Sequence, residues 1–188
     1  MIDAVRIPKM RMKKLLPVKA EFEELTGVKI EVNDEVRIES DDAIKVMRAK
    51  QMIHAFGRGF DIEAVKDLLD DEYMFEDVNI KEYAGKSRKR LITLRGRVIG
   101  TKGRTKRLIE ELAGVKIAIY GKTVGIIGKW DRVQLAKQAV DMLLSGSMHN
   151  TVSVSYTHLR AHETRHDLVC RPLLEKKKTE KLTAVEIK

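Results

Sequence analysis

The sequence contains one cysteine and no long apolar run. Cys170 is the single thiol among 188 residues, which excludes an internal disulfide framework and suits a reducing compartment. No stretch approaches the roughly 18 apolar residues that a membrane helix needs, and residues 1–8 lack the apolar core of a signal peptide. We therefore expect a soluble, cytoplasmic protein with no membrane partner.

Acidic residues are absent from one strongly basic segment. The chain as a whole carries 37 Lys+Arg against 28 Asp+Glu, a net charge of +9, which favours a polyanionic partner. Between Lys86 and Ile109 there is no acid at all. The ten basic residues there are Lys86, Arg88, Lys89, Arg90, Arg95, Arg97, Lys102, Arg104, Lys106 and Arg107. A solvated charged face explains many such runs, but this one ends inside a Gly-x-x-Gly loop, which favours contact with nucleic acid.

That loop consists of Gly100, Thr101, Lys102 and Gly103. Two residues without a Cβ let the backbone come close to a nucleic-acid strand. A helix pattern begins directly behind the loop and directs free N–H groups and a positive dipole end at the same place. The sequence therefore predicts a loop that grips the phosphates of RNA or single-stranded DNA.

An internal repeat organises the chain. The segment 23–32 matches 110–119 at an offset of 87, and the same offset carries Ala49-Lys50-Gln51 onto Ala136-Lys137-Gln138. This period is too long for a solenoid and fits two small domains. In the second copy, apolar periodicity and capping residues predict the order strand, helix, helix, strand, strand, helix. The expected elements are a strand at 77–83, a helix after Ser87, a helix that ends at Gly114, strands at 115–119 and 124–127, and a helix from Asp131.

This order, with the loop between the first two helices, resembles the type I KH domain. The resemblance implies an α+β fold in which a three-stranded antiparallel sheet carries helices on one face. It also implies a clamp on about four nucleotides, whose bases lie in an apolar groove. Gly100 and Gly103 would admit the phosphates, and Thr101 and Lys102 would contact them. The other RNA-binding residues implied are Arg97, Arg104 and Lys106 among the cations, and Val98, Ile99, Ile109, Val115 and Ile117 as groove walls. Each of these aliphatic residues is at least as well explained as plain core.

The first copy departs from the pattern at the loop. Gly100 and Gly103 correspond there to Lys13 and Leu16, and no glycine precedes Gly27. We expect this copy to fold as a degenerate KH domain that packs or contacts proteins. The expected divisions are a degenerate KH domain at 1–59, an acidic helical linker at 60–74, a KH domain with the loop at 75–150 and a tail outside the family at 151–188.

Tandem copies joined in this way look like the archaeal KH-domain ribosome-assembly proteins, which are similar to the eukaryotic partner-of-Nob factor. The resemblance covers about Val5 to Thr151. It implies a non-catalytic protein without cofactors that binds single-stranded RNA near the 3′ end of small-subunit ribosomal RNA. It further implies the processing endonuclease and the initiation factor α subunit as partners. A different interpretation of the same folds is a scaffold that contacts ribosomal or initiation-factor protein surfaces.

The tail after Thr151 has no KH counterpart. It resembles a segment found behind unrelated translated sequences, as read-through of non-native DNA produces, and we expect it to be disordered. It contains His162-Glu163-Thr164-Arg165-His166, which satisfies the H-E-x-x-H pattern of zinc hydrolases. Such a site needs a buried helix and a cleft. The 38 residues behind an RNA-binding module supply neither, so a zinc hydrolase is only a remote alternative. We therefore expect no metal site and no catalytic residue.

Overall fold

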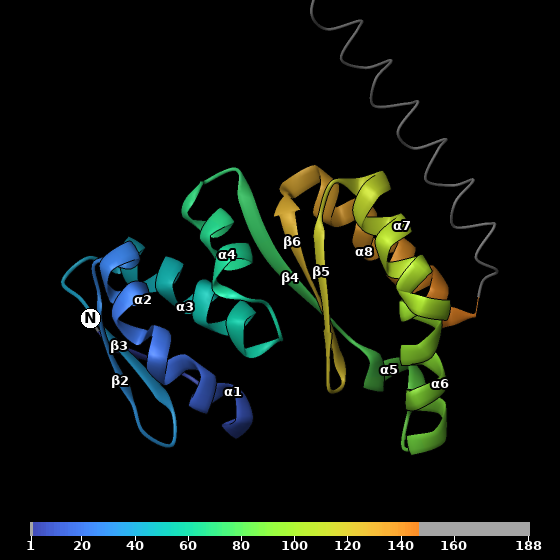
Figure 1. Cartoon of the computed structure of the whole chain (residues 1–188), viewed down its shortest axis with the longest axis horizontal. Coiled ribbons are helices and arrows are strands. Elements are labelled where there is room, and N and C mark those ends of the chain that lie inside the picture. Colours follow the sequence, from blue (N-terminus) through green and yellow to red (C-terminus); the bar gives the residue numbers. More distant parts are fainter. Residues whose placement is uncertain (1, 147–188) are drawn as a thin grey trace, which may run out of the picture. The chain divides into compact units, whose positions relative to one another are not determined.

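The computed structural model describes residues 2–146, which lie in one compact unit (Figure 1). Strands and helices are interspersed along the chain, and the strands form two three-stranded antiparallel sheets. The same element order recurs around each sheet, so the predicted α+β fold with two KH-type sheets is confirmed. No helix in this part of the chain is long and apolar enough to cross a membrane.

The first copy builds its sheet from three short strands. Its elements are, in chain order, β1 (Ile2–Val5), α1 (Lys9–Leu15), the 3-10 turn η1 (Leu16–Val18), α2 (Lys19–Thr26), β2 (Lys29–Val32), β3 (Val36–Glu39) and α3 (Ala43–Gly57). Strand β3 lies between β1 and β2. The paired residues Ile30 and Ile38 are fully buried, whereas their neighbours along each strand face solvent, as expected when one face of a sheet carries helices.

The second copy repeats this plan with longer strands and one additional helix. Its elements are β4 (Tyr73–Asn79), α5 (Ile80–Ala84), α6 (Arg88–Ile99), the 3-10 turn η3 (Thr101–Gly103), α7 (Arg104–Ala113), β5 (Lys116–Tyr120), β6 (Thr123–Lys129) and α8 (Trp130–Ser145). Strand β6 lies between β4 and β5. Helix α7 ends at Gly114, whose left-handed backbone (φ 65°) confirms the predicted glycine stop.

The prediction for the first strand of the second copy is wrong. The pattern predicts this strand at 77–83, and it lies at Tyr73–Asn79. The side chain of Asn79 accepts a hydrogen bond from the backbone N–H of Lys81 at 3.1 Å, and this cap starts α5 at Ile80. Val78 and Ile80 are both buried, so their alternation is real, but Ile80 packs from a helix.

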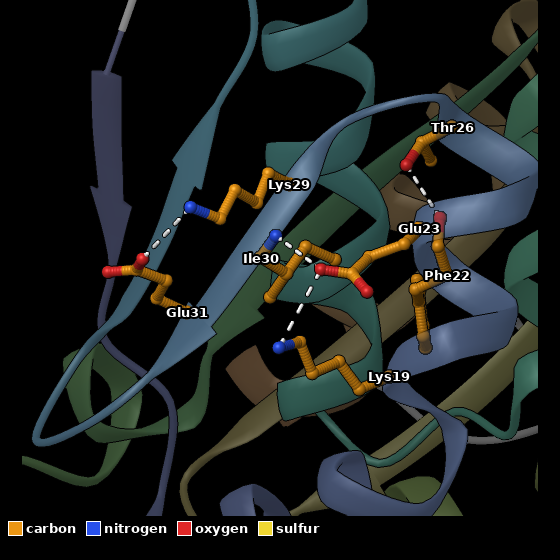
Figure 2. Close-up of polar contacts among 7 residues, drawn as sticks. All are labelled: Lys19, Phe22, Glu23, Thr26, Lys29, Ile30 and Glu31. Carbon is orange, nitrogen blue, oxygen red and sulfur yellow. Dashed lines mark hydrogen bonds and ion pairs between the residues drawn. The ribbon is translucent and has the colours of Figure 1, made fainter.

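A glutamate brace ties the second helix of the first copy to its sheet (Figure 2). Glu23 accepts a hydrogen bond from the backbone N–H of Ile30 at 2.7 Å, and its carboxylate lies 3.7 Å from the ammonium of Lys19. The brace is partly buried, where a charge-assisted hydrogen bond is stronger than at the surface. It fixes the angle at which α2 meets β2.

The second copy contains the same brace at the repeat offset. Glu110 accepts from the backbone N–H of Ile117 at 2.8 Å and lies 3.6 Å from the ammonium of Lys106. The duplication seen in the sequence is therefore repeated at the level of individual atoms. In this copy the brace positions α7, the helix that starts directly behind the Gly-x-x-Gly loop.

Strand β6 is buried on both faces because the first copy covers the side of the sheet that its own helices leave open. Residues 123–128 are all buried. Ile127 belongs to the same apolar cluster as the core of the first copy, and Phe60 and Phe75 meet edge to face at 6.2 Å against it. Gly125 makes room for these rings, since a Cβ there would lie 2.8 Å from Phe60 and 3.1 Å from Phe75.

The segment between the copies, expected as an acidic helical linker, packs against both of them. It forms α4 (Ile62–Val65) and the 3-10 turn η2 (Lys66–Leu69), whose Val65 and Leu68 are buried in the apolar cluster. The ammonium of Lys66 lies 2.9 Å from Glu21 of α2, and Asp67 lies 2.7 Å from Lys116 of β5. The segment thus forms ion pairs with both copies.

We predict that Gly125→Ala lowers the free energy of unfolding by about 1–3 kcal/mol, because the added methyl overpacks the contact with Phe60 and Phe75. Gly96→Ala is the matched control. It lies inside α6, and no atom lies within 4 Å of the place that its Cβ would take, so it should stabilise by about 0.5–1 kcal/mol. Urea unfolding measures both. A Gly125→Ala protein as stable as the parent would contradict the tight contact.

Candidate nucleic-acid interface

The Gly-x-x-Gly loop turns the chain by means of three positions with unusual backbone angles. Gly100 has φ 72° and ψ 172°, Lys102 has φ 54°, and Gly103 has φ 76°. Lys102 is the one residue other than glycine with positive φ in the described chain. The left-handed conformation costs a residue with a Cβ about 1–2 kcal/mol. The fold therefore holds a strained lysine at the tip of the loop.

The two glycines serve different physical needs. A Cβ on Gly100 would lie 2.1 Å from the hydroxyl oxygen of Thr105 and 2.7 Å from its backbone nitrogen. The first turn of α7 therefore occupies the space beside Gly100. No atom lies within 4 Å of the corresponding position on Gly103, so that side of the loop is open to a ligand. Sequence reasoning missed Thr105, although its place two residues behind the second glycine was visible.

The loop presents cations that nothing else in the described chain neutralises. Thr101, Lys102 and Arg104 are exposed, and neither Lys102 nor Arg104 has an ion-pair partner among residues 2–146. They stand at the N-terminus of α7, where free backbone N–H groups and the helix dipole attract anions. Backbone access, dipole and cations thus coincide at one place.

Two of the predicted cations are held by the protein itself. Arg97 is partly exposed, and its guanidinium donates to the backbone carbonyl of Gly146 at 3.2 Å. Lys106 lies beside Glu110 in the brace described above. The positive groups of both residues are therefore already engaged within the protein.

Most of the predicted groove wall belongs to the core. Val98, Ile109, Val115 and Ile117 are buried, with at most 6% of their surface exposed, so all four pack in the core. Ile99 is partly exposed and remains available. Exposed or partly exposed aliphatic side chains that the prediction omitted are Leu108 on α7 and Ile119, which shares a face of β5 with Ile117.

In the first copy no loop separates the corresponding helices. Helix α1 runs through η1 into α2, and the buried guanidinium of Arg11 donates to the backbone carbonyls of Phe56, at 2.8 Å, and Phe60. The guanidinium carbon also lies 4.4 Å from the centre of the Phe56 ring. Burial lowers the pKa of Arg11, but it stays charged at neutral pH. This cation is committed to packing.

The described residues contain no group of three histidine, cysteine, aspartate or glutamate side chains that could hold a metal ion. The H-E-x-x-H pattern at 162–166 and the predicted tail at 151–188 lie outside the residues that the structure describes.

We predict that Gly100→Ala destabilises the protein by about 2–4 kcal/mol, because the methyl group meets Thr105 and the backbone angles suit only glycine. Gly103→Ala meets no neighbour and should cost about 1–2 kcal/mol, from its left-handed backbone alone. Chemical unfolding of the two variants tests this order. Equal losses would mean that α7 gives way to the new methyl.

Comparison with known proteins identifies the family. The sequence model of the "Eukaryotic type KH-domain (KH-domain type I)" matches residues 74–163, a span that continues past Thr151, where we expected the family pattern to end. A KH domain-containing protein of Methanocaldococcus jannaschii is 38% identical over 158 residues, which make up 79% of this chain and 69% of that protein. The pre-rRNA-processing protein pno1 of Schizosaccharomyces pombe is 33% identical over 61% of this chain, which spans about half (47%) of that relative.

A solved structure gives the same answer. The structure of an a/eIF2α–aDim2p–rRNA complex from Pyrococcus horikoshii contains a chain with a TM-score of 0.79 and 34% sequence identity. The similarity covers 86% of this chain and 95% of that one. The predicted family is therefore confirmed, and the chain belongs to the archaeal Dim2/PNO1-like KH-domain proteins, homologous to the eukaryotic pre-rRNA-processing protein PNO1.

Proposed function

We propose that this protein binds single-stranded pre-ribosomal RNA through the loop of its second copy, and that it acts without catalysis in small-subunit assembly and 3′-end processing in the cytoplasm. The observation that carries the proposal is Lys102, exposed and unpaired among the described residues, in a left-handed backbone between two glycines at the start of α7. Phosphates fit this place because it combines backbone access with positive charge.

The RNA-binding set that we propose is smaller than the predicted one. Gly103, Thr101, Lys102 and Arg104 contact the phosphates directly. Gly100 acts by letting α7 pack against the loop, and Ile99 is the one predicted aliphatic residue exposed enough to meet a base. Arg97 and Lys106 assist from the flanking helices.

The names of the relatives support the choice of RNA and of the process. The Schizosaccharomyces pombe relative is a pre-rRNA-processing protein, and the Pyrococcus horikoshii relative was solved with rRNA and a/eIF2α. We propose that this chain shares those partners, and that the endonuclease that trims the RNA is a neighbour in the same assembly. The domain limits at 1–59, 60–74 and 75–150 serve as the working divisions of this proposal.

A second candidate function is a protein-contact scaffold, and the first copy favours it. That copy has no loop, and α3 exposes Ile44 and Met47 to 66% and 61%. At the repeat offset the second copy carries the polar residues Asp131 and Gln134. A scaffold predicts binding that depends weakly on salt, whereas phosphate contacts give a steep salt dependence.

The test replaces the loop cations with acids. Thr101→Asp combined with Lys102→Asp should weaken binding of a short single-stranded RNA at least 100-fold, because two carboxylates would face the phosphates, and it should flatten the salt dependence. Fluorescence anisotropy across a salt series measures both. Both side chains are exposed, so melting and the far-UV spectrum should not change.

Lys13→Asp combined with Lys14→Asp is the matched control. These exposed residues of α1 correspond to Gly100 and Thr101 at the repeat offset, and the change removes at least as much positive charge. RNA affinity should stay within about threefold of the parent. If the loop variant binds RNA as the parent does, or if both variants lose affinity equally, the proposal that the Gly-x-x-Gly loop binds the RNA is wrong.

A further inference from the structure

The second copy contains an insertion that the first copy lacks. In the first copy, three residues separate the end of β1 at Val5 from the start of α1 at Lys9. In the second copy, β4 ends at Asn79 and α6 starts at Arg88, and α5 lies between them. The duplication therefore gives an internal reference, because the KH-type sheet and helices of the first copy form without this segment.

The insertion is firmly attached to the second copy. The backbone N–H of Ile80 donates to the carbonyl of Lys122 in the turn between β5 and β6 at 2.8 Å. The hydroxyl of Tyr83 donates to Asp141 of α8 at 2.8 Å, and Ile80 and Ala84 are buried. These contacts hold α5 in one position against the sheet and α8, so the residues that come after α5 are presented from a rigid base.

A group of exposed cations comes directly after α5, and we call it the distal basic cluster. It consists of Lys86, Arg88, Lys89 and Arg90. None of the four side chains has an ion pair or hydrogen bond within residues 2–146. Elsewhere in the described chain, cations such as Arg48, Lys50 and Lys137 lie against carboxylates. Four adjacent unpaired cations repel one another, and a polyanion relieves this repulsion.

The distal basic cluster lies at the opposite end of α6 from the loop. In Figure 1, α6 leads from α5 to α7. Its 12 residues, at about 1.5 Å each, separate the cluster from Gly100 by about 18 Å. This distance exceeds the reach of one side chain, so the cluster and the loop contact different phosphates. No acid occurs between them in the sequence, and Lys122 stands at the same end as the cluster.

We propose that the distal basic cluster is a second RNA contact, which binds the phosphates of nucleotides that flank the segment gripped by the loop. This inference rests on the proposed function of the loop. The arginines form forked hydrogen bonds to phosphate oxygens and the lysines supply point charges, so the cluster holds a backbone without reading its sequence. The insertion thereby lengthens the RNA footprint beyond the approximately four nucleotides of a KH clamp.

The experiment removes the cluster and varies the length of the RNA. The test variant replaces all four residues with glutamine: Lys86→Gln, Arg88→Gln, Lys89→Gln and Arg90→Gln. Binding is measured in the full chain with a single strand of about 5 nucleotides, a single strand of about 15 nucleotides, and the 5-nucleotide strand joined to a short hairpin. Each titration is repeated across a salt series.

The short strand should bind the variant as well as the parent, within about twofold. The 15-nucleotide strand should bind about 10- to 100-fold more weakly, and the slope of log affinity against log salt should fall by about 2–3, since each phosphate contact with a single strand contributes about 0.7. If the hairpin probe shows the larger loss, the flanking phosphates belong to a duplex. If the 15-nucleotide strand shows it, they belong to a single strand.

A control variant removes four exposed cations from the first copy: Lys13→Gln, Lys14→Gln, Arg37→Gln and Lys45→Gln. It matches the change in net charge and should leave all three affinities unchanged. Equal losses in the test and control variants would show a general charge effect and overturn the second contact. So would an unchanged affinity for both longer probes, or an equal loss on the 5-nucleotide strand.

The outcome also separates this inference from the proposed function. If the parent binds none of the RNAs, or if acids at Thr101 and Lys102 leave the binding of the short strand intact, the loop proposal fails. If acids at Thr101 and Lys102 abolish binding of the short strand, but the glutamine variant binds the longer probes as well as the parent does, the loop proposal stands and the second contact at the distal basic cluster is overturned. Because the four side chains are exposed, melting should not change. The smaller pair Lys89→Gln and Arg90→Gln repeats the test with half the effect on the slope.

Discussion

The burial of β6 on both faces is the constraint on which the two-copy arrangement depends. A KH-type sheet normally carries helices on one face, and here the second face would expose Ile127 and the flank of Gly125. Phe60, which directly follows the first copy, fills that place, and it can do so because Gly125 has no side chain. The contact is apolar and close-packed, so it contributes to stability roughly in proportion to the area removed from water. The described residues therefore form one compact unit.

The two copies share the glutamate brace between helix and sheet, but they differ in the segment that precedes the braced helix. Glu23 and Glu110 make the same hydrogen bond to a strand N–H at the repeat offset, so the angle between helix and sheet is preserved in both copies. In the second copy this brace holds the helix that starts at the loop. In the first copy the corresponding helices run on through Pro17, and Arg11 is used to bond Phe56 and Phe60. Phe60, which packs against β6, is therefore bonded to α1, and in the second copy the corresponding helix α6 leads to the Gly-x-x-Gly loop.

Local chemistry made much of this predictable from the sequence. The loop between two helix patterns, the glycine stop at Gly114 and the 87-residue repeat are short-range signals, and each appears in the structure. The rest depends on long-range packing, which short-range signals do not determine. The resemblance to KH domains implies Val98 and Ile117 as groove walls, and the structure buries both. The strand predicted at 77–83 ends at Asn79, and the sequence does not show this because the alternation of apolar residues does not separate the buried Val78 of a strand from the buried Ile80 of a helix.

Lys102 shows why strain points to function more clearly than charge does. The chain has many exposed lysines, and most of them need no explanation beyond solubility. In the left-handed conformation, however, glycine or asparagine would suit folding better by about 1 kcal/mol. The fold maintains the lysine there because α6 and α7 fix both ends of the loop, through the contact of Gly100 with Thr105 on one side and the Glu110 brace on the other. A cation kept at such a position, without a protein partner among the described residues, supports the proposal that this loop binds phosphates. The first copy has neither the strain nor the open backbone, which explains why its own cluster of lysines on α1 is not equivalent.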